Sequence, residues 1–128
     1  MTKILIVEEE DRIRRVYSWL LRSRGVEIIE ARGSWEAAAT FISERVDLIL
    51  LDLKLSDIDS RDFLEIIQEY DPEIKVMTFD AQPVEQQKKI APAAVDHFDK
   101  SQSIFVLLEK INNILSSKSY RESARYRF

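Results

Sequence analysis

Three short apolar stretches of this sequence each end on charged residues. They are residues 4–7 before Glu8 and Glu9, residues 48–51 before Asp52, and Phe98 before Asp99 and Lys100. If the stretches are neighbouring parallel strands, their carboxyl ends meet at one edge of a sheet and gather several carboxylates around one lysine. Side chains of these types could do ionic chemistry at that edge, so this charge cluster is the clearest indication of function in the chain.

The composition is that of one globular domain. The chain has 128 residues, 45% of them apolar, which is enough for one hydrophobic core. The absence of cysteine excludes a disulfide framework and a thiolate metal site. No apolar run approaches the roughly 20 residues that span a bilayer, and the N-terminus lacks the apolar region of a signal peptide. We therefore expect a cytoplasmic protein with no membrane partner, and the net charge of −4 argues against nucleic-acid binding over the whole domain.

Two hydrophobic periods alternate along the sequence. Short apolar stretches bounded by polar residues or glycine predict strands at residues 3–7, 26–29, 47–51, 75–79 and 96–99. Helices are predicted from residue 13 to near Gly25, at 35–45, from Ser60 as N-cap to Asp71, at 84–91 after Pro83, and at 104–115 with Ser101 or Ser103 as cap. This alternation predicts a parallel α/β sheet covered on both faces, because parallel neighbours need helical crossovers. Such sheets bind ligands outside the carboxyl ends of their strands.

The order and spacing of several motifs resemble the receiver domain of bacterial two-component response regulators. The motifs are Ile-Leu-Ile-Val-Glu-Glu-Glu at residues 4–10, the glycines at 25 and 33, Asp-Leu-Ile-Leu-Leu-Asp-Leu-Lys-Leu at 47–55, and Phe-Asp-Lys at 98–100. The resemblance covers most of the chain and implies a receiver domain at residues 1–117, followed by a basic, aromatic segment at 118–128. It also implies a flavodoxin-like, doubly wound (βα)5 fold, with a five-stranded parallel sheet in the order 2-1-3-4-5.

By the same resemblance the charged edge is a phosphorylation site. Asp52 matches the aspartate that accepts a phosphoryl group from a histidine kinase, and Lys100 matches the lysine that pairs with the acyl phosphate. Glu8 and Glu9 match the acidic pair that holds Mg2+ together with Asp52, and Lys54 matches the residue whose backbone carbonyl completes the metal site. The residue types suit this chemistry, because a carboxylate that attacks a phosphoryl group needs a divalent cation to offset the charge on both partners. A lysine then steadies the transferred oxygens as a point charge.

Several positions depart from the pattern of the family. Glu8 and Glu9 stand where two aspartates are usual. Each side chain is one methylene longer, so the spacing of the oxygens that would bind Mg2+ directly must change. Asp80 occupies the switch position, usually Thr or Ser, and His97 occupies that of the switch aromatic. A carboxylate at position 80 would oppose phosphorylation, since two unit charges about 4 Å apart repel by roughly 4 kcal/mol at an effective dielectric constant of about 20. Two other arrangements are open for Asp80: it pairs with Lys100, or it turns into solvent.

Simpler interpretations stand beside these. The acids at residues 8–11 could be favourable charges in the first turn of a helix, and Lys100 could only counterbalance nearby acids. His97 could be a hydrogen-bonded surface or half-buried histidine. The segment at 118–128 has four bases, one acid and three aromatics. It is either an extended last helix or linker, or a segment that docks on an acidic partner or nucleic acid.

Two functions therefore compete. The first is a stand-alone receiver of a phosphorelay: a histidine kinase or phosphotransfer protein phosphorylates Asp52, and a target protein reads the change at the fourth helix, fifth strand and fifth helix, with a homodimer as a further expectation. The second is a phosphorylation-independent pseudo-receiver that acts as a protein-binding module. An enzyme is not expected. A phosphatase of the haloacid-dehalogenase type has a second acid two residues after its nucleophile, where this chain has Lys54.

Overall fold

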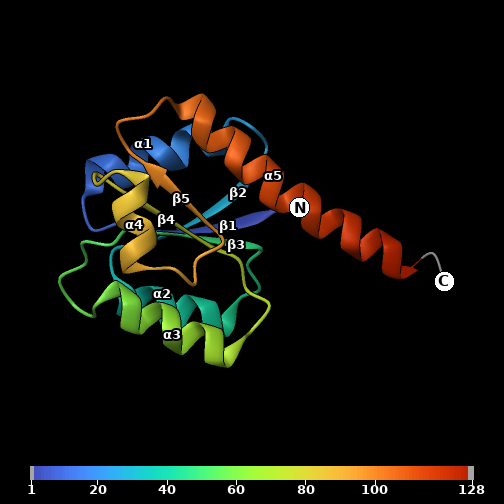
Figure 1. Cartoon of the computed structure of the whole chain (residues 1–128), viewed down its shortest axis with the longest axis horizontal. Coiled ribbons are helices and arrows are strands. Elements are labelled where there is room, and N and C mark those ends of the chain that lie inside the picture. Colours follow the sequence, from blue (N-terminus) through green and yellow to red (C-terminus); the bar gives the residue numbers. More distant parts are fainter. Residues whose placement is uncertain (1, 127–128) are drawn as a thin grey trace.

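A computed structural model describes the backbone of residues 2–126 and the surroundings of the side chains of residues 2–116. Five parallel strands form one sheet in the order β2-β1-β3-β4-β5 (Figure 1). The strands are β1 (Lys3–Val7), β2 (Glu27–Ala31), β3 (Leu48–Leu51), β4 (Val76–Asp80) and β5 (Asp96–Asp99). The flavodoxin-like order predicted for the sheet is confirmed, and the first and last strands have the predicted bounds.

Each strand is followed by a helix, as predicted. The helices are α1 (Asp11–Arg22), α2 (Ser34–Ser43), α3 (Ser60–Tyr70), α4 (Val84–Ile90) and α5 (Ile104–Tyr126). The N-cap predicted for α3 is wrong by one residue: the cap is Asp59, whose carboxylate accepts the N–H of Arg61 at 2.8 Å. Of the two caps left open for α5, the structure selects Ser103, whose hydroxyl accepts the N–H of Phe105 at 3.1 Å. No helix in the described part of the chain is long and apolar enough to cross a membrane.

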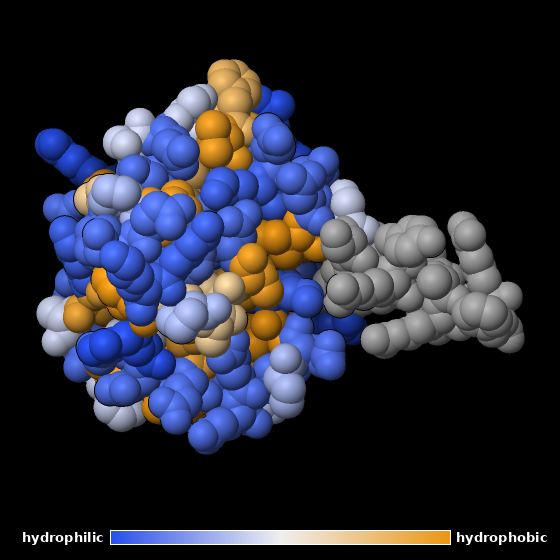
Figure 2. All heavy atoms as spheres, in the orientation of Figure 1, coloured by the Kyte–Doolittle hydropathy of each residue, from blue (hydrophilic) through white to orange (hydrophobic). Residues whose placement is uncertain are grey.

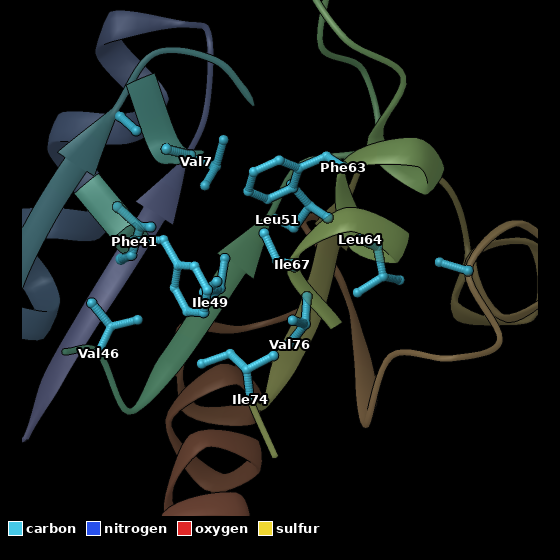
Figure 3. Packing of buried hydrophobic residues seen from close by; sticks show 14 residues of the cluster. Val7, Phe41, Val46, Ile49, Leu51, Phe63, Leu64, Ile67, Ile74 and Val76 are labelled. Carbon is cyan, nitrogen blue, oxygen red and sulfur yellow. The ribbon is translucent and has the colours of Figure 1, made fainter. Parts of the chain in front are cut away.

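Two apolar layers cover the sheet, one on each face. Alternate residues of β1 and β3 point to opposite faces: Leu5, Val7, Ile49 and Leu51 pack with α2 and α3, and Ile4, Ile6, Leu48 and Leu50 pack with α1 and α5. Figure 3 shows the first layer, where Phe63 and Ile67 of α3 lie over Leu51. Burial on both sides explains why these strands are continuously apolar in sequence. The outer surface in Figure 2 is mainly hydrophilic, with separate apolar patches.

The register of the strands brings their carboxyl ends to the same level. Val7 lies opposite Leu51 in β3, and Asp80 lies opposite Asp99 in β5. The residues that follow these strands therefore begin at one edge of the sheet. The backbone N–H of Asp52 donates to the carbonyl of Val7 at 3.0 Å, so the hydrogen-bonded ladder extends to the first residue beyond β3.

Candidate functional site

Lys100 connects two buried carboxylates at the carboxyl edge of the sheet. Its Nζ lies 2.9 Å from Oε1 of Glu8 and 3.4 Å from Oδ2 of Asp52. Only 1% of Glu8 and 5% of Asp52 is exposed. The ends of the first, third and fifth strands thus gather carboxylates around one lysine, as the sequence predicts.

The surroundings of Asp52 hold it in one orientation and raise its pKa. The N–H of Lys54 donates to Oδ1 at 2.9 Å, and the hydroxyl of Ser60 donates to the backbone carbonyl of Asp52 at 2.7 Å. Burial raises the pKa of Asp52 to about 6, and Glu8 adds to the rise, while the N–H of Lys54 and the charge of Lys100 oppose it. The Asp52 carboxyl is therefore mostly ionised at neutral pH, yet it titrates far above its ordinary pKa of 3.8.

Lys100 stays charged although it is largely enclosed. Burial alone would lower its pKa, but the hydrogen bond and charge of Glu8 and the charge of Asp52 outweigh that effect and raise it. The ammonium also lies 4.7 Å from the centre of the Phe79 ring, which contributes a cation–π attraction. The ring of Tyr17 packs nearly perpendicular to the same ring, with 5.6 Å between ring centres. The lysine is thus fixed by carboxylates on one side and by an aromatic ring on another.

The two predicted metal-binding glutamates point in different directions. Glu8 points inward, and its Oε2 is buried with no hydrogen-bond partner. Glu9 is exposed and accepts a hydrogen bond from the hydroxyl of Ser56, in the loop after β3. The structure therefore places Glu8, but not Glu9, in contact with the cluster around Lys100.

The donor set at this edge fits a hard divalent cation that keeps several waters. The unpartnered Oε2 of Glu8 and the carboxylate of Asp52 are oxygen ligands of the kind that Mg2+ prefers. Among the described residues there is no group of three or more acidic, histidine or cysteine side chains that could hold a metal by themselves. Any cation here must complete its shell with water and backbone carbonyl oxygens.

Asp80 adopts neither of the arrangements predicted for it. The residue is only 1% exposed, so it does not turn into solvent. Its carboxylate forms no ion pair with Lys100 in the described structure; instead Oδ2 accepts the side-chain N–H of Gln82 at 2.8 Å and its backbone N–H at 3.3 Å. Lys100 contacts Asp80 only through the backbone, where its N–H donates to the carbonyl at 2.9 Å. The reason is that Glu8 and Asp52 already hold the ammonium, while Gln82 follows Asp80 in the same turn.

His97 belongs to a buried polar network that the sequence did not predict. Oγ1 of Thr78 lies 2.5 Å from Nδ1 of His97 and donates its proton to Oε1 of Gln87 at 2.8 Å. Because that proton goes to Gln87, Nδ1 must be the protonated nitrogen of the ring. The amide of Gln87 in turn donates to the carbonyls of Phe98 and Gln82, both at 2.8 Å. Burial lowers the pKa of His97, so the imidazole is favoured in its neutral form.

Buried Arg14 fixes the backbone that follows β1. The guanidinium of Arg14, which is 4% exposed, donates to the carbonyl of Glu8 at 2.9 Å and binds Asp11 and Glu30. Its only signal in the sequence is the three-residue spacing from Asp11, which is equally typical of a surface pair.

Asp57 caps α2 from the loop after β3. Its carboxylate accepts the N–H of Ser34 at 3.1 Å and of Trp35 at 3.0 Å. Partial burial acts to raise the pKa of Asp57, but these backbone N–H groups outweigh it and lower the pKa. A Cβ atom at Gly33 would lie 2.7 Å from Oδ2 of Asp57, so a larger residue there would displace the capping carboxylate. The Asp52 loop is thus fastened to a neighbouring helix.

Comparison with known proteins places the chain in a family. Residues 4–112 match the response regulator receiver domain. The chain is 27% identical over 121 residues to sporulation initiation phosphotransferase F of Bacillus subtilis, covering 91% of this chain and 96% of that protein. It is 36% identical over 92 residues to the KDP operon transcriptional regulatory protein KdpE of Escherichia coli, covering 69% of this chain but only 39% of that protein.

A solved structure shows the same likeness. The response regulator protein TrrA of Thermotoga maritima, crystallised in complex with Mg2+ and BeF, superposes with a TM-score of 0.82 at 27% identity. The match covers 89% of this chain and 99% of TrrA. The likeness to TrrA therefore extends over nearly the whole domain.

Proposed function

The chain belongs to the response regulator receiver domain family, and from this premise we propose that it receives a phosphoryl group on Asp52 in a two-component phosphorelay. The observation that carries the proposal is the contact of Lys100 with Asp52 and Glu8 at the carboxyl edge of the sheet. The donor is a histidine kinase or a phosphotransfer protein, and the modified domain acts in the cytoplasm by contact with a target protein through α4, β5 and α5. The domain signals and is not itself an enzyme.

In this proposal Asp52 is the nucleophile. A carboxylate oxygen of Asp52 forms a bond to phosphorus while the bond from phosphorus to the histidine nitrogen of the donor breaks, giving an acyl phosphate. The N–H of Lys54 fixes the rotation of the carboxylate, and Lys100 faces its other oxygen as a point charge. With a pKa of about 6, Asp52 is mostly in the ionised form that attack requires at neutral pH.

Mg2+, when bound, supplies positive charge that offsets the charges of the carboxylate and the phosphoryl group. Glu8, through its unpartnered Oε2, Asp52 and the backbone carbonyl of Lys54 would hold it. Glu9, which is turned toward Ser56, would contribute only if that contact opened.

A second candidate function is a protein-binding module that works without phosphorylation. The observation that favours it is the buried carboxylate of Asp80 at the switch position, whose Oδ1 has no hydrogen-bond partner. A carboxylate cannot donate the hydrogen bond that a switch hydroxyl offers to a phosphoryl group. In this second function the receiver fold presents a fixed surface to its target.

Incubation with acetyl phosphate and Mg2+ distinguishes the two functions. Intact-mass spectrometry should show the gain of one phosphoryl group in the wild type and none in Asp52→Asn, which keeps the shape of the side chain. Asp62→Asn, which alters an exposed carboxylate of α3, serves as the matched control and should be modified like the wild type. An unmodified wild-type chain in millimolar Mg2+ would refute phosphoryl transfer to Asp52 and leave the binding module.

A further inference from the structure

The outer surface of α2 and α3 exposes four large apolar side chains. Trp35 and Ile42 of α2 are 69% and 64% exposed, and Ile66 and Tyr70 of α3 are 54% and 63% exposed. Spacings of seven residues in α2 and four in α3 place each pair on one side of its helix. The two helices meet through the rings of Phe41 and Tyr70, whose centres are 5.6 Å apart. We call this surface, made by Trp35, Ile42, Ile66 and Tyr70, the α2–α3 face.

The α2–α3 face is hollowed where the two helices end. A hollow of about 230 Å³ there is more polar than apolar: it is lined by Phe41, Ile42, Val46 and Tyr70, and by Ser43, Glu44, Arg45 and Asp71. A side chain inserted there would need an apolar part to pack on the rings and a polar or charged end to meet the polar lining, as tyrosine and arginine have.

The charges around the α2–α3 face are mainly negative. Exposed acids lie on both helices: Glu36 directly follows Trp35, and Asp62 lies one turn before Ile66. Glu65 and Glu69 are also exposed, on the side of α3 toward α4. None of Asp62, Glu65 and Glu69 forms a salt bridge within the described residues. Of the nearby bases, Arg61 is paired with Asp59, whereas Arg45, which lines the hollow, has no salt bridge within the described residues either. An occupant of this face must therefore bring apolar side chains together with positive charge.

The chain itself contains a segment with that chemistry. Residues 118–128, Lys-Ser-Tyr-Arg-Glu-Ser-Ala-Arg-Tyr-Arg-Phe, have four basic residues, one acid and three aromatics, in a chain whose net charge is −4. The structure describes the backbone of this segment to Tyr126, as the continuation of α5. Aromatic and arginine residues are the types most enriched at the energetic centres of interfaces.

The path of α5 prevents this segment from reaching the α2–α3 face of its own molecule. α5 packs on the opposite side of the sheet from α2 and α3, and in Figure 1 it continues past the sheet and away from the body. With 23 residues the helix is about 35 Å long, roughly twice the length of a strand of this sheet. We propose that residues 118–128 of one molecule dock on the α2–α3 face of a second copy.

Self-association measured by sedimentation velocity tests this proposal on the full chain. The wild type should form dimers or longer assemblies whose affinity falls as salt is raised, because part of the attraction is between charges. A face variant, Ile42→Ser with Ile66→Ser, and a segment variant, Arg121→Gln with Arg125→Gln, should each associate at least about tenfold more weakly. Matched controls, Val16→Ser in α1 and Lys88→Gln with Lys89→Gln in α4, change exposed residues elsewhere and should associate like the wild type.

Mixing the two variants gives the sharper test. The face variant keeps an intact segment and the segment variant keeps an intact face, so the mixture should form one working interface and associate more tightly than either variant does alone. In a Trp19→Phe background Trp35 is the only tryptophan, since the chain has two. Its emission should shift to shorter wavelength in the mixture as the indole leaves water. Circular dichroism verifies that both variants are folded.

Each other outcome overturns the proposal. A wild type that stays monomeric at all concentrations would show that the face has a different occupant or none. Association that survives in both variants, or variants that fail to complement each other, would show that the segment and the face do not meet. Asp52→Asn should associate like the wild type. The association test therefore does not depend on whether Asp52 accepts a phosphoryl group.

Discussion

Lys100 donates a 2.9 Å hydrogen bond to Glu8, and so joins the residue that follows β5 to the residue that follows β1. Glu8 also raises the pKa of Asp52, although burial is the larger cause. Glu8→Gln removes this negative charge, so the positive charge of Lys100 then acts on Asp52 alone. We expect the pKa of Asp52 to fall below its value of about 6. Carbon NMR titration of the Asp52 carboxyl measures the change, with Glu9→Gln as the exposed control; an unchanged or higher pKa in Glu8→Gln would contradict the electrostatic account.

The raised pKa of Asp52 implies a stability cost at neutral pH. Between the ordinary pKa of 3.8 and the folded value of about 6, the folded protein binds more protons than the unfolded chain, so this group makes stability decrease as pH rises through that window. Asp52→Asn should therefore increase the free energy of unfolding at about pH 7.5 by about 1 to 2 kcal/mol, after allowance for screening by solvent. Urea denaturation across pH measures this gain, which should vanish near about pH 4. A gain independent of pH would show another cause.

Asp57 and Gly33 form a pair whose effects should not add. Asp57→Ala removes the cap of α2 and should lower the free energy of unfolding by about 1 to 2 kcal/mol. Gly33→Ala should destabilise the protein because its Cβ would meet Oδ2 of Asp57 at 2.7 Å. In the double variant that contact is absent, so Gly33→Ala should cost much less than it does alone. A double-mutant cycle by thermal denaturation measures the difference. Equal costs in both backgrounds would exclude a clash with Asp57.

His97 should stay neutral at a pH where an ordinary histidine is charged. Burial lowers its pKa below 6.5, so its contribution to stability is complete above about that pH and is lost as pH falls through the folded pKa. The chain has one histidine, so its proton NMR signals are resolved without assignment. A midpoint at or above 6.5 would be inconsistent with the buried network.

The same network should be sensitive to loss of one hydroxyl. Thr78→Val keeps the shape of the side chain but leaves Nδ1 of His97 and Oε1 of Gln87 without their shared partner. We expect a loss of about 2 to 3 kcal/mol in the free energy of unfolding, because buried polar groups left unpaired carry their desolvation cost. Thr40→Val, on the partly exposed side of α2, is the matched control. A cost similar to that of the control would mean that the network contributes little.

Asp80 should oppose phosphorylation by its charge. Asp80→Thr removes a buried carboxylate and supplies a hydroxyl, and we expect faster modification of Asp52 by acetyl phosphate. Asp80→Asn separates the two effects, since it removes the charge without supplying a hydroxyl. Equal rates for the wild type and both variants would show that repulsion from position 80 is not what limits the reaction.

The sequence predicted the parts of the fold that depend on burial of continuous apolar segments. The strand at residues 48–51 is apolar throughout because both of its faces are covered, and its end therefore placed Asp52 correctly at the sheet edge. Lys100 could be placed beside Asp52 for the same reason. The direction of single polar side chains could not be predicted in this way. The carboxylate of Asp80 is turned toward Gln82 by the local turn, and buried Arg14 has the sequence pattern of a surface residue.

The burial of Gln87 is another feature that the sequence could not predict. A glutamine in a short, polar helix is typical of a solvent-facing position, yet this one is 0% exposed. Its burial is possible only because Thr78 and the carbonyls of Phe98 and Gln82 satisfy its amide from other elements. Such satisfaction depends on the packing of α4 against β4 and β5, which no local pattern encodes.

The length of α5 has a hydrodynamic consequence. A helix of 23 residues that continues past a small body gives a 15.0 kDa chain more friction in water than a sphere of the same mass. A single copy should therefore elute early in gel filtration and tumble slowly in NMR relaxation. Shape alone could thus be taken for a larger mass, and the number of associated copies has to be read from a measurement that separates mass from friction.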